Sequence, residues 1–556
     1  MTPPRPPHPP DLSRSETGAQ GDRPAAHWPH YAVPPERVPL IGRDAFIARL
    51  AAGAFVDDVP LLDFNQPPAP PSDTPFLNRA ALAEALADGN AALGNPLNAE
   101  TLAAIRGEGR MVIAGQQPGL LLGPMFTLLK AVTAVNAAEQ LQPSLNVPIV
   151  PAFWIASEDH DLEEVNRVTV GDGKLVLDHP QLHRPGPRPP VGHVTLSDHR
   201  AELERFVEQA ANDLPHGRTL ADLTAELNLS SYATQFGQLL ARLLRRPGAP
   251  AGGAGIVLVD PEWLRDLTAP VLAAAAERWA DLETALQQGR DHLAQQDLTP
   301  PLERVNLFKL DQWDRRVAED VTPDSPAEIR RNPEQFSPSA ALRPIVQDAI
   351  LPTLATVAGP TELLYLWQID PLYRVMHMQR SWLLPRLSAT LLDARTAHHV
   401  ERLNLPEPTY VFDVFDHLRE LENAPAVDDA DLSQLQSLAE QLTEELAAID
   451  EPAERKTIGK AINSIRYRID RVTRRVHQRR LDRDGVGRRS LQRIADVVYP
   501  HHQLQERRMS VLEAVGRLGP GLVHALRRLD VTRFDHHLLL ATQPPAGVTA
   551  SKESHA

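Results

Sequence analysis

The chain has 556 residues, of which 42% are hydrophobic and 23% charged, and its net charge is −15. This composition predicts an ordinary globular protein of roughly two to four domains, and the negative charge argues against binding nucleic acid through a general positive field. The chain contains no cysteine, which excludes disulfides, thiolate–zinc sites and a thiol nucleophile. The longest apolar run is too short to span a bilayer and the N-terminus does not resemble a signal peptide, so we expect a cytoplasmic protein without a membrane partner.

The organisation of the chain follows from changes in composition. Residues 1–35 are rich in proline and lack apolar periodicity, which predicts a disordered N-terminus, and residues 543–556 predict a disordered tail. From residue 36 to residue 395, apolar strand-like runs alternate with helical patterns, which predicts an α/β core. We interpret the segment from about residue 168 to residue 250 as an insertion into this core, because its first part is rich in proline, glycine and histidine.

The most informative stretch is residues 111–166, which combines two apolar runs with two polar turns. Its pattern predicts a strand at residues 111–114, a Gly-rich turn, an amphipathic helix and a second strand at residues 148–155. A third apolar run, residues 255–259, also ends in a carboxylate, Asp260. A parallel βαβ unit places both of its polar turns at the carboxyl edge of the sheet, where doubly wound folds bind ligands. We therefore expect the ligand site at this edge.

The first turn contains Gly115, Gln116, Gln117 and Gly119. Its glycines permit close backbone approach, and the start of the following helix presents unpaired N–H groups, so the turn suits a phosphate or a carboxylate. The two glutamines can orient a ligand but are poor acids or bases. The turn matches neither a Walker loop nor the GxGxxG fingerprint. A tight strand-to-helix connection with solvent-facing amides explains the same residues equally well.

The second turn places Glu158, Asp159 and Asp161 around His160. Three functions fit this cluster: a general base held by neighbouring carboxylates, a metal site, or capture of an ammonium group. We disfavour the metal site, because a second ligand cluster of suitable spacing is not evident. The structural alternative is N-capping of a helix, which Asp161 or Ser157 could provide. Four caps in one turn are implausible, so we favour a functional site.

Two later segments bring polar residues to turns that contain proline and glycine. Arg343 and Gln347 lie in the first of these segments, and Glu362 and Tyr365 lie in the second. Together they predict a wall that faces the substrate, although each of these residues alone is more often structural.

Residues 428–482 predict a different architecture. Leucines with helical spacing are followed by Pro452, which breaks the helix, and then by isoleucines and valines in alternating steps of four and three, a heptad seam. The first helix is acidic and the second is basic, which predicts an antiparallel hairpin. We interpret residues 396–490 as a coiled-coil dimerisation domain and residues 491–542 as a segment that returns to the core. Phosphate binding by the arginines of the second helix is the alternative.

Taken in order, these motifs resemble one family along most of the chain, from about residue 38 to residue 519. They comprise Gly115-Gln116-Gln117-Pro118-Gly119 with Gly123, Pro124 and Lys130, then Pro151 to Asp161 and Asn166, Arg343-Pro344, Gln347-Asp348, Leu351-Pro352, Gly359 to Glu362, Tyr365, Pro385-Arg386 and Leu504 to Arg507. The set resembles the cysteine-adding enzymes of bacillithiol biosynthesis, the BshC family.

The resemblance implies a Rossmann-like parallel-sheet core with inserted connecting segments and an α-helical coiled-coil hairpin that forms a homodimer. It implies a ligase that adds L-cysteine to the amine of glucosaminyl malate in the last step of bacillithiol biosynthesis. Synthetase relatives activate the carboxylate as an adenylate, so ATP or ADP is the expected cofactor, without a metal. Gln116 and Gln117 stand where those relatives carry a histidine-based signature, and their lysine-rich signature has no counterpart. The resemblance also implies a second, adenine-nucleotide site near the coiled coil, with the candidates Tyr499, Gln505, Glu506 and Arg507.

The chemistry of the residues agrees with this pair of substrates. The helix start and Arg343 suit carboxylates, the acidic turn suits an ammonium group, and His160 could take the proton that the amine loses. The residues expected to bind substrate are Gly115, Gln116, Gln117, Gly119, Trp154, Arg343, Gln347, Glu362 and Tyr365, and those expected to be catalytic are Glu158, Asp159, His160 and Asp161. The alternatives are a nucleotidyltransferase or metal-dependent hydrolase that uses Asp159 and His160, and a non-enzymatic nucleotide-binding coiled-coil scaffold.

Overall fold

The computed structural model describes the chain in several stretches. These are residues 36–39, 45–51, 54–55, 58–245, 255–393, 395–397, 488–500, 503–519, 521–533 and 536–541. The two termini predicted to be disordered and the hairpin predicted at residues 428–482 lie outside the described residues. Among the helices that the structure describes, none is long and apolar enough to cross a membrane.

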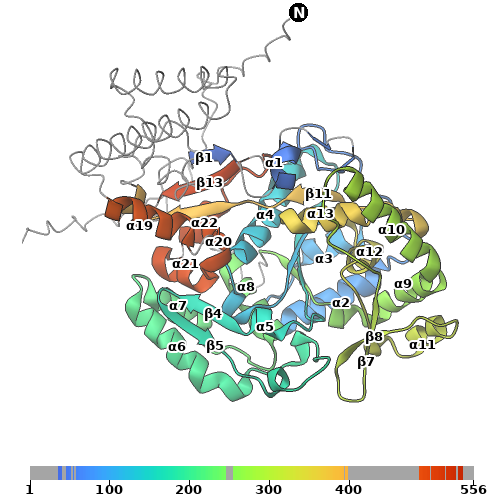
Figure 1. Ribbon diagram of the computed structural model, residues 1–556, viewed down its shortest axis with the longest axis horizontal. Coiled ribbons are helices and arrows are strands. Elements are labelled where there is room, and N and C mark those ends of the chain that lie inside the picture. Colours follow the sequence, from blue (N-terminus) through green and yellow to red (C-terminus); the bar gives the residue numbers. More distant parts are fainter. Residues whose placement is uncertain are drawn as a thin grey trace, which may run out of the picture. The chain divides into compact units, whose positions relative to one another are not determined.

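A five-stranded parallel sheet forms the centre of the core (Figure 1). Its strands, in spatial order, are β11 (Trp382–Pro385), β10 (Thr353–Ala358), β2 (Arg110–Gln116), β3 (Ile149–Ile155) and β6 (Val257–Val259). Every neighbouring pair is parallel. The apolar runs that predicted β2, β3 and β6 form buried strands because helices cover both faces of the sheet. The predicted α/β core with a parallel sheet is confirmed.

The strand order creates a topological switch point between β2 and β10. From β2 the chain proceeds to β3 and β6 on one side, and it then crosses back to β10 and β11 on the other side. In an open parallel sheet, ligands bind in the crevice beyond the carboxyl ends of the strands at such a point. Gln116 and Ala358 are the last residues of the two strands. The fold therefore places the expected ligand crevice beside them.

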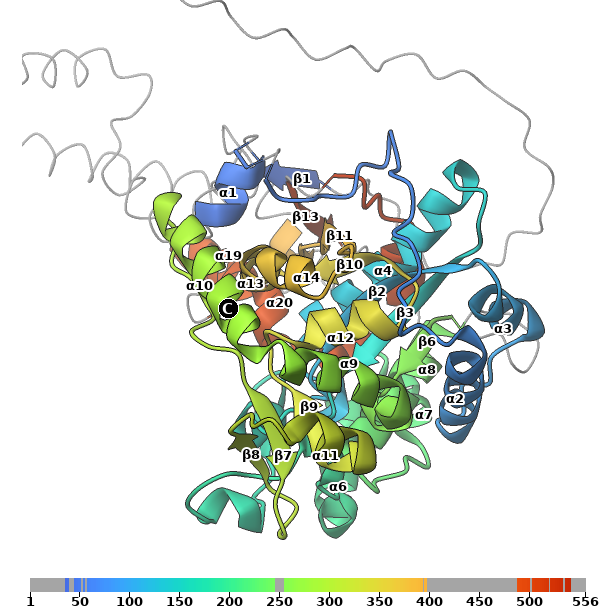
Figure 2. The ribbon, with the colours of Figure 1, turned by 90° about the vertical axis from the view of Figure 1, so that its right-hand side faces the viewer.

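Successive strand residues pack on opposite faces of the sheet. In β2, Val112 belongs to the apolar cluster that contains α4 (Phe126–Leu141) and α8 (Tyr232–Leu244), whereas Ile113 belongs to the cluster on the other face. The helices of that second cluster include α2 (Arg79–Ala92), α3 (Ala99–Arg106), α9 (Arg265–Glu277), α10 (Trp279–Gln295), α12 (Arg343–Ile350), α13 (Pro360–Gln368) and α14 (Asp370–Val375). Figure 2 shows α9, α10 and α12 on the near side of the sheet.

Smaller elements flank the two layers. The segment predicted as an insertion contains the hairpin of β4 (Arg167–Val170) and β5 (Gly173–Val176), followed by α6 (Arg200–Asp213), α7 (Gly217–Thr224) and α8. A second small sheet combines β7 (Leu307–Leu310), β8 (Arg316–Glu319) and β9 (Phe336–Pro338), with α11 (Ser325–Arg331) inserted between its last two strands. The first helix in the described part of the chain is α1 (Ala45–Ala51).

The C-terminal segment packs against the core beside the switch point. Its elements are α19 (Arg488–Val498), α20 (Gln505–Arg508), α21 (Val511–Leu518), α22 (Gly521–Leu526) and β13 (His536–Ala541). Strand β13 pairs in parallel with β12 (Ala389–Leu392) and antiparallel with β1 (Glu36–Pro39). The N–H of Val511 donates to the carbonyl of Gly123 at 2.9 Å, which holds this segment against the turn between β2 and α4.

Candidate active site

The turn after β2 has an unusual backbone, and one amide at its end is bound by the C-terminal segment. It contains the short 3-10 helix η1 (Leu120–Leu122), in which Leu121 and Leu122 have φ values of 49° and 73°. Positive φ is costly for leucine, and burial of both side chains in the apolar core offsets this cost. At the start of α4, the N–H of Met125 donates to the carbonyl of Met509 at 2.8 Å. The Met125 amide is therefore engaged within the protein, whereas Pro124, Phe126 and Thr127 of the same helix start line a cavity, so binding of an anion there stays a prediction.

Lys130, from α4, connects the two strand ends at the switch point. Its side chain is buried, and its ammonium group donates to the Gly115 carbonyl and to Gln116 Oε1, both at 2.9 Å. The same nitrogen lies 2.6 Å from Glu362 Oε2, which also accepts the N–H of Gly359. Burial lowers the pKa of Lys130, and the Glu362 carboxylate opposes this shift only in part. One buried cation thus joins the turn after β2 to the turn after β10.

Asp159 is the residue of the acidic turn that faces this crevice. Its Oδ2 accepts a hydrogen bond from Gln117 Nε2 at 2.9 Å and lies 3.9 Å from Arg343 Nη2. Burial by itself would raise the pKa of Asp159, but Arg343, the Gln117 hydrogen bond and Arg316 outweigh it and lower the pKa. Asp159 is therefore a stable anion, which suits capture of an ammonium group better than proton transfer.

His160 lies against the hairpin of β7 and β8. Arg316 Nη1 donates to His160 Nδ1 at 3.1 Å, and the imidazole is 5.8 Å from the Phe308 ring, centroid to centroid. Burial and the charge of Arg316 lower the pKa of His160, so the ring is neutral and carries its proton on Nε2. Because one nitrogen is occupied by Arg316 and the other is protonated, the ring is poorly arranged to accept a proton from a substrate.

The other two acids of this turn have structural partners. Glu158 is 1% exposed and forms a close ion pair with Arg265. Asp161 is the N-cap of α5 (Leu162–Val165), where it accepts the N–H of Glu164 at 3.2 Å. A buried salt bridge and a helix cap account for these carboxylates, which corrects their assignment as catalytic residues.

Asp260, at the end of β6, makes stability depend on pH. Burial raises its pKa to about 7, although it accepts hydrogen bonds from Ser157 Oγ and from the Glu262 N–H. The folded protein keeps this proton up to about pH 7, whereas an unfolded aspartate loses it near pH 4, so the stability from this residue falls as the pH rises through that window. Asparagine does not titrate. We therefore expect the free energy of unfolding of Asp260→Asn, relative to that of wild type, to rise on the order of 2–3 kcal/mol from about pH 5 to about pH 8. Urea unfolding at both pH values measures this gain.

The exposed Asp281→Asn is the control for that measurement, because Asp281 lies on the surface at the start of α10. The free energy of unfolding of this variant, relative to that of wild type, should change by less than about 0.5 kcal/mol over the same pH range. An equal pH response of the two variants would contradict the buried, protonated state of Asp260.

The crevice at the switch point contains a cavity of about 350 Å³, here called the smaller cavity. Asp159 lines it, and so do eight of the nine residues predicted to bind substrate: Gly115, Gln116, Gln117, Trp154, Arg343, Gln347, Glu362 and Tyr365. Glu158, His160 and Asp161 are not among its lining residues. The structure therefore brings together residues from four separate sequence segments around one space.

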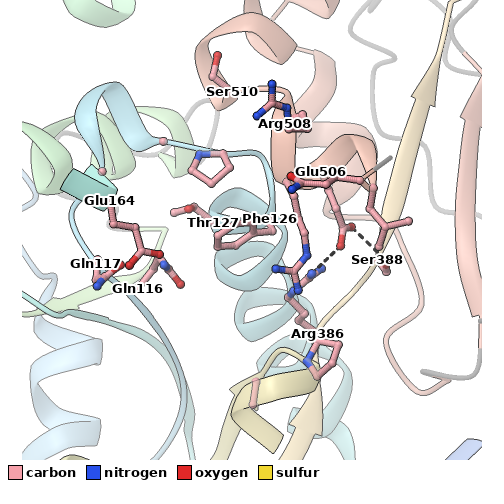
Figure 3. Close-up of a pocket in the computed structure, with 18 of the residues that line it drawn as sticks. Gln116, Gln117, Phe126, Thr127, Glu164, Arg386, Ser388, Glu506, Arg508 and Ser510 are labelled. Carbon is pink, nitrogen blue, oxygen red and sulfur yellow. Dashed lines mark hydrogen bonds and ion pairs between the residues drawn. The ribbon is translucent and has the colours of Figure 1, made fainter. Parts of the chain in front are cut away.

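A larger cavity of about 650 Å³ adjoins the smaller one and is shown in Figure 3. The two cavities share Gln116, Gln117, Glu164, Arg386 and Arg507, together with several apolar side chains. The larger cavity is also lined by three residues that we predicted, Gly119, Tyr499 and Glu506. Residues expected at the second nucleotide site thus border a cavity that adjoins the crevice.

The fourth candidate of that site, Gln505, has a structural role. Its side chain is 3% exposed, exchanges two hydrogen bonds with the backbone of Leu391 and donates to the Val497 carbonyl. Gln505 lines neither of the two cavities. These bonds fix α20 to β12 and leave no donor of the amide for a nucleotide, which corrects its assignment as a nucleotide ligand.

Three residues of the cavity walls, Trp154, Thr127 and Arg343, each have a buried polar atom without a hydrogen-bond partner within the described residues. Trp154 Nε1 borders the smaller cavity and Thr127 Oγ1 borders the larger one, and neither makes a hydrogen bond within the described residues. Leaving a buried polar group unsatisfied costs about 1–3 kcal/mol, so these atoms suit hydrogen bonds with a bound molecule. Lys130, Glu164 and Arg386 are further wall residues to which the sequence assigned no role.

Within the part of the chain that the structure describes, no group of three histidine, aspartate or glutamate side chains is close enough to hold a metal ion.

Two family models match this chain in succession. The model described as "Bacillithiol biosynthesis BshC, N-terminal Rossmann-like domain" matches residues 63–387, and "Bacillithiol biosynthesis BshC, C-terminal coiled-coil domain" matches residues 389–540. A Solibacter usitatus protein named "Putative cysteine ligase BshC" is 31% identical over 462 residues, which cover 77% of this chain and 84% of the relative. A Symbiobacterium thermophilum protein of the same name is 31% identical and covers 81% of this chain and 87% of its own length. The predicted order of a Rossmann-like core and a coiled coil is confirmed.

Proposed function

This chain belongs to the BshC family of bacillithiol biosynthesis, and on that basis we propose that it is a ligase that joins L-cysteine to the amine of glucosaminyl malate. The bond formed is an amide between the cysteine carboxyl carbon and the sugar nitrogen. Formation of an amide from a free carboxylate requires activation, and we propose ATP or ADP as the source.

The observation that supports cysteine as a substrate is the pairing of opposite charges in the smaller cavity. Asp159 Oδ2 and Arg343 Nη2 lie 3.9 Å apart, a separation too long for a strong hydrogen bond between them. An α-amino acid carries its ammonium and carboxylate groups on the same carbon and can bind both side chains at once. Arg343 Nε also lacks a hydrogen-bond partner within the described residues, so the guanidinium has capacity for a carboxylate.

The larger cavity suits the more anionic partner. Arg507 and Arg508 are exposed in its wall, whereas Arg386 is neutralised by Glu506. Within the described residues neither of these two arginines pairs with a carboxylate, which favours a dicarboxylate such as malate, or the phosphates of a nucleotide. We propose that this cavity holds glucosaminyl malate and that Tyr499 and Arg507 contact the nucleotide. The proposed homodimer through residues 396–490 remains a prediction.

Incubation with L-cysteine, glucosaminyl malate and ATP, followed by mass spectrometry, tests the ligase function. We expect the cysteine–glucosaminyl malate conjugate together with AMP or ADP, and neither product when cysteine is omitted. Absence of the conjugate under every nucleotide condition would contradict the proposal.

Asp159→Asn tests the assignment of the smaller cavity to cysteine. We expect the KM for cysteine to rise about tenfold or more, because an amide replaces the carboxylate that binds the ammonium group and a charged hydrogen bond contributes about 1.5–3 kcal/mol. The KM for glucosaminyl malate should stay nearly constant. Asp172→Asn, in the exposed turn between β4 and β5, is the control. An unchanged KM for cysteine in the Asp159 variant would assign the amino acid to another site.

A further inference from the structure

Glu164 lies where the smaller and larger cavities meet. It is the third residue of α5, and its side chain lines both cavities. Figure 3 shows its carboxylate beside the side chains of Gln116 and Gln117, at the end of β2. The helix begins immediately after its cap, Asp161, and its first turn places Glu164 in the crevice together with Asp159 of the acidic turn.

The other carboxylates in the cavity walls are already engaged. They are Asp159, Glu362 and Glu506, and each accepts hydrogen bonds from the protein or pairs with an arginine or lysine. Glu164 interacts with the Gln117 amide, but within the described residues it forms no ion pair. It is therefore the wall carboxylate with the most capacity for a substrate.

The surroundings of Glu164 make it more basic than an ordinary glutamate. Burial raises its pKa, and the carboxylates of Asp161 and Asp159 raise it further, while the Gln117 amide and the charge of Lys130 oppose these shifts only in part. Asp159, by comparison, has a lowered pKa. Because a stronger base accepts a proton more readily, Glu164 is better suited to proton transfer than its neighbour.

We propose that Glu164 is the general base of the ligation step, an inference that rests on the proposed ligase function. The amine nitrogen of glucosaminyl malate attacks the carboxyl carbon of an activated cysteine, an acyl phosphate or acyl adenylate made from ATP. The C–N bond forms, and the bond between the carboxyl carbon and the phosphate oxygen breaks. The N–H proton passes to the Glu164 carboxylate, and the phosphate or AMP leaves with the bonding electron pair.

Glu164→Gln tests this role, because glutamine keeps the size of the side chain but cannot accept a proton. We expect kcat for conjugate formation to fall about 10²–10⁴-fold. The control is Glu163→Gln, on the same helix. The Glu163 carboxylate pairs with Arg188 and is 59% exposed, and the residue lines neither cavity. This control should stay within about twofold of wild type.

Trapping with hydroxylamine separates proton transfer from activation. Hydroxylamine is a strong nucleophile with little need of a base, so Glu164→Gln should form cysteine hydroxamate from cysteine and ATP at nearly the wild-type rate. A conjugate rate close to wild type in this variant would overturn the proposal. Loss of hydroxamate together with conjugate would also overturn it, because Glu164 would then serve binding or activation. Absence of conjugate with the wild-type protein would instead contradict the ligase function itself.

Discussion

Replacing Arg386 with leucine is expected to lower the free energy of unfolding by about 3–5 kcal/mol, because it leaves a buried carboxylate without its cation. Arg386 Nη2 lies 2.5 Å from Glu506 Oε1, and the two side chains are only 5% and 0% exposed. Burial alone would raise the pKa of Glu506, but Arg386 reverses this and lowers it. The pair connects the end of β11 to α20, so its loss also loosens one wall of the larger cavity.

The effect of this substitution should depend on pH. Since the pKa of Glu506 is lowered in the folded protein, the pair stabilises the protein above the ordinary glutamate pKa, and this contribution is lost as the pH falls through the folded value. Urea unfolding measures the change as a shift of the midpoint at constant slope. Arg374→Leu is the control, because it breaks an exposed pair with Asp370 and should cost less than about 1 kcal/mol. Equal losses in the two variants would contradict the burial of the Arg386 pair.

Lys130→Met is expected to reduce conjugate formation by about 10²-fold, because a small displacement of positioning groups has effects of this size. The substitution keeps the apolar stem but removes the ammonium group that holds Gln116 and Glu362 on opposite sides of the switch point. The turns after β2 and β10 then lose their common contact. Steady-state kinetics with both substrates measures the loss, and thermal unfolding checks that the variant folds.

Lys174→Met is the matched control for this prediction. Lys174 lies in β5, is exposed and lines neither cavity, so its removal should leave kcat/KM unchanged. If Lys130→Met kept wild-type kinetics while folding normally, the contact between the two strand ends would not matter for the reaction.

The parallel core was predictable because its signal is local. Apolar runs of strand length alternate with helical patterns, and buried parallel strands require such runs. The sequence also placed both polar turns of the βαβ unit at one edge of the sheet, and the ends of β2 and β3 do lie side by side. The strand that completes the crevice, β10, begins more than two hundred residues after β2. Its position next to β2 depends on the crossover between the two halves of the sheet, which no local pattern indicates.

The acidic turn shows why the candidate site was only partly predictable. Consecutive residues in a turn point in different directions, so a cluster in the sequence need not be a cluster in space. Asp159 faces the crevice, whereas Glu158 turns inward to Arg265 and Asp161 caps α5. Arg265 lies in α9, more than a hundred residues after Glu158. No pattern in the sequence indicates that these two residues form an ion pair.

Two wall residues had weaker signals that could have been used. Lys130 lies in a mostly apolar helix, and a lysine at such a position requires a buried partner. Glu164 follows the predicted cap Asp161 by three residues, which placed it on the first turn of a helix at the ligand edge. Its place in a cavity wall depends on residues beside β10, β11 and α20, which come from distant parts of the chain.

The two cavities are proposed to be the two halves of one active site, with Gln117 and Glu164 at their junction. Equilibrium displacement tests this most directly, with labelled L-cysteine and labelled glucosaminyl malate each bound to the protein and then challenged with the unlabelled conjugate. Because the conjugate spans both halves, we predict that it displaces both ligands, whereas neither substrate displaces the other. Displacement of only one ligand, or mutual displacement of the two substrates, would contradict a single site formed by both cavities.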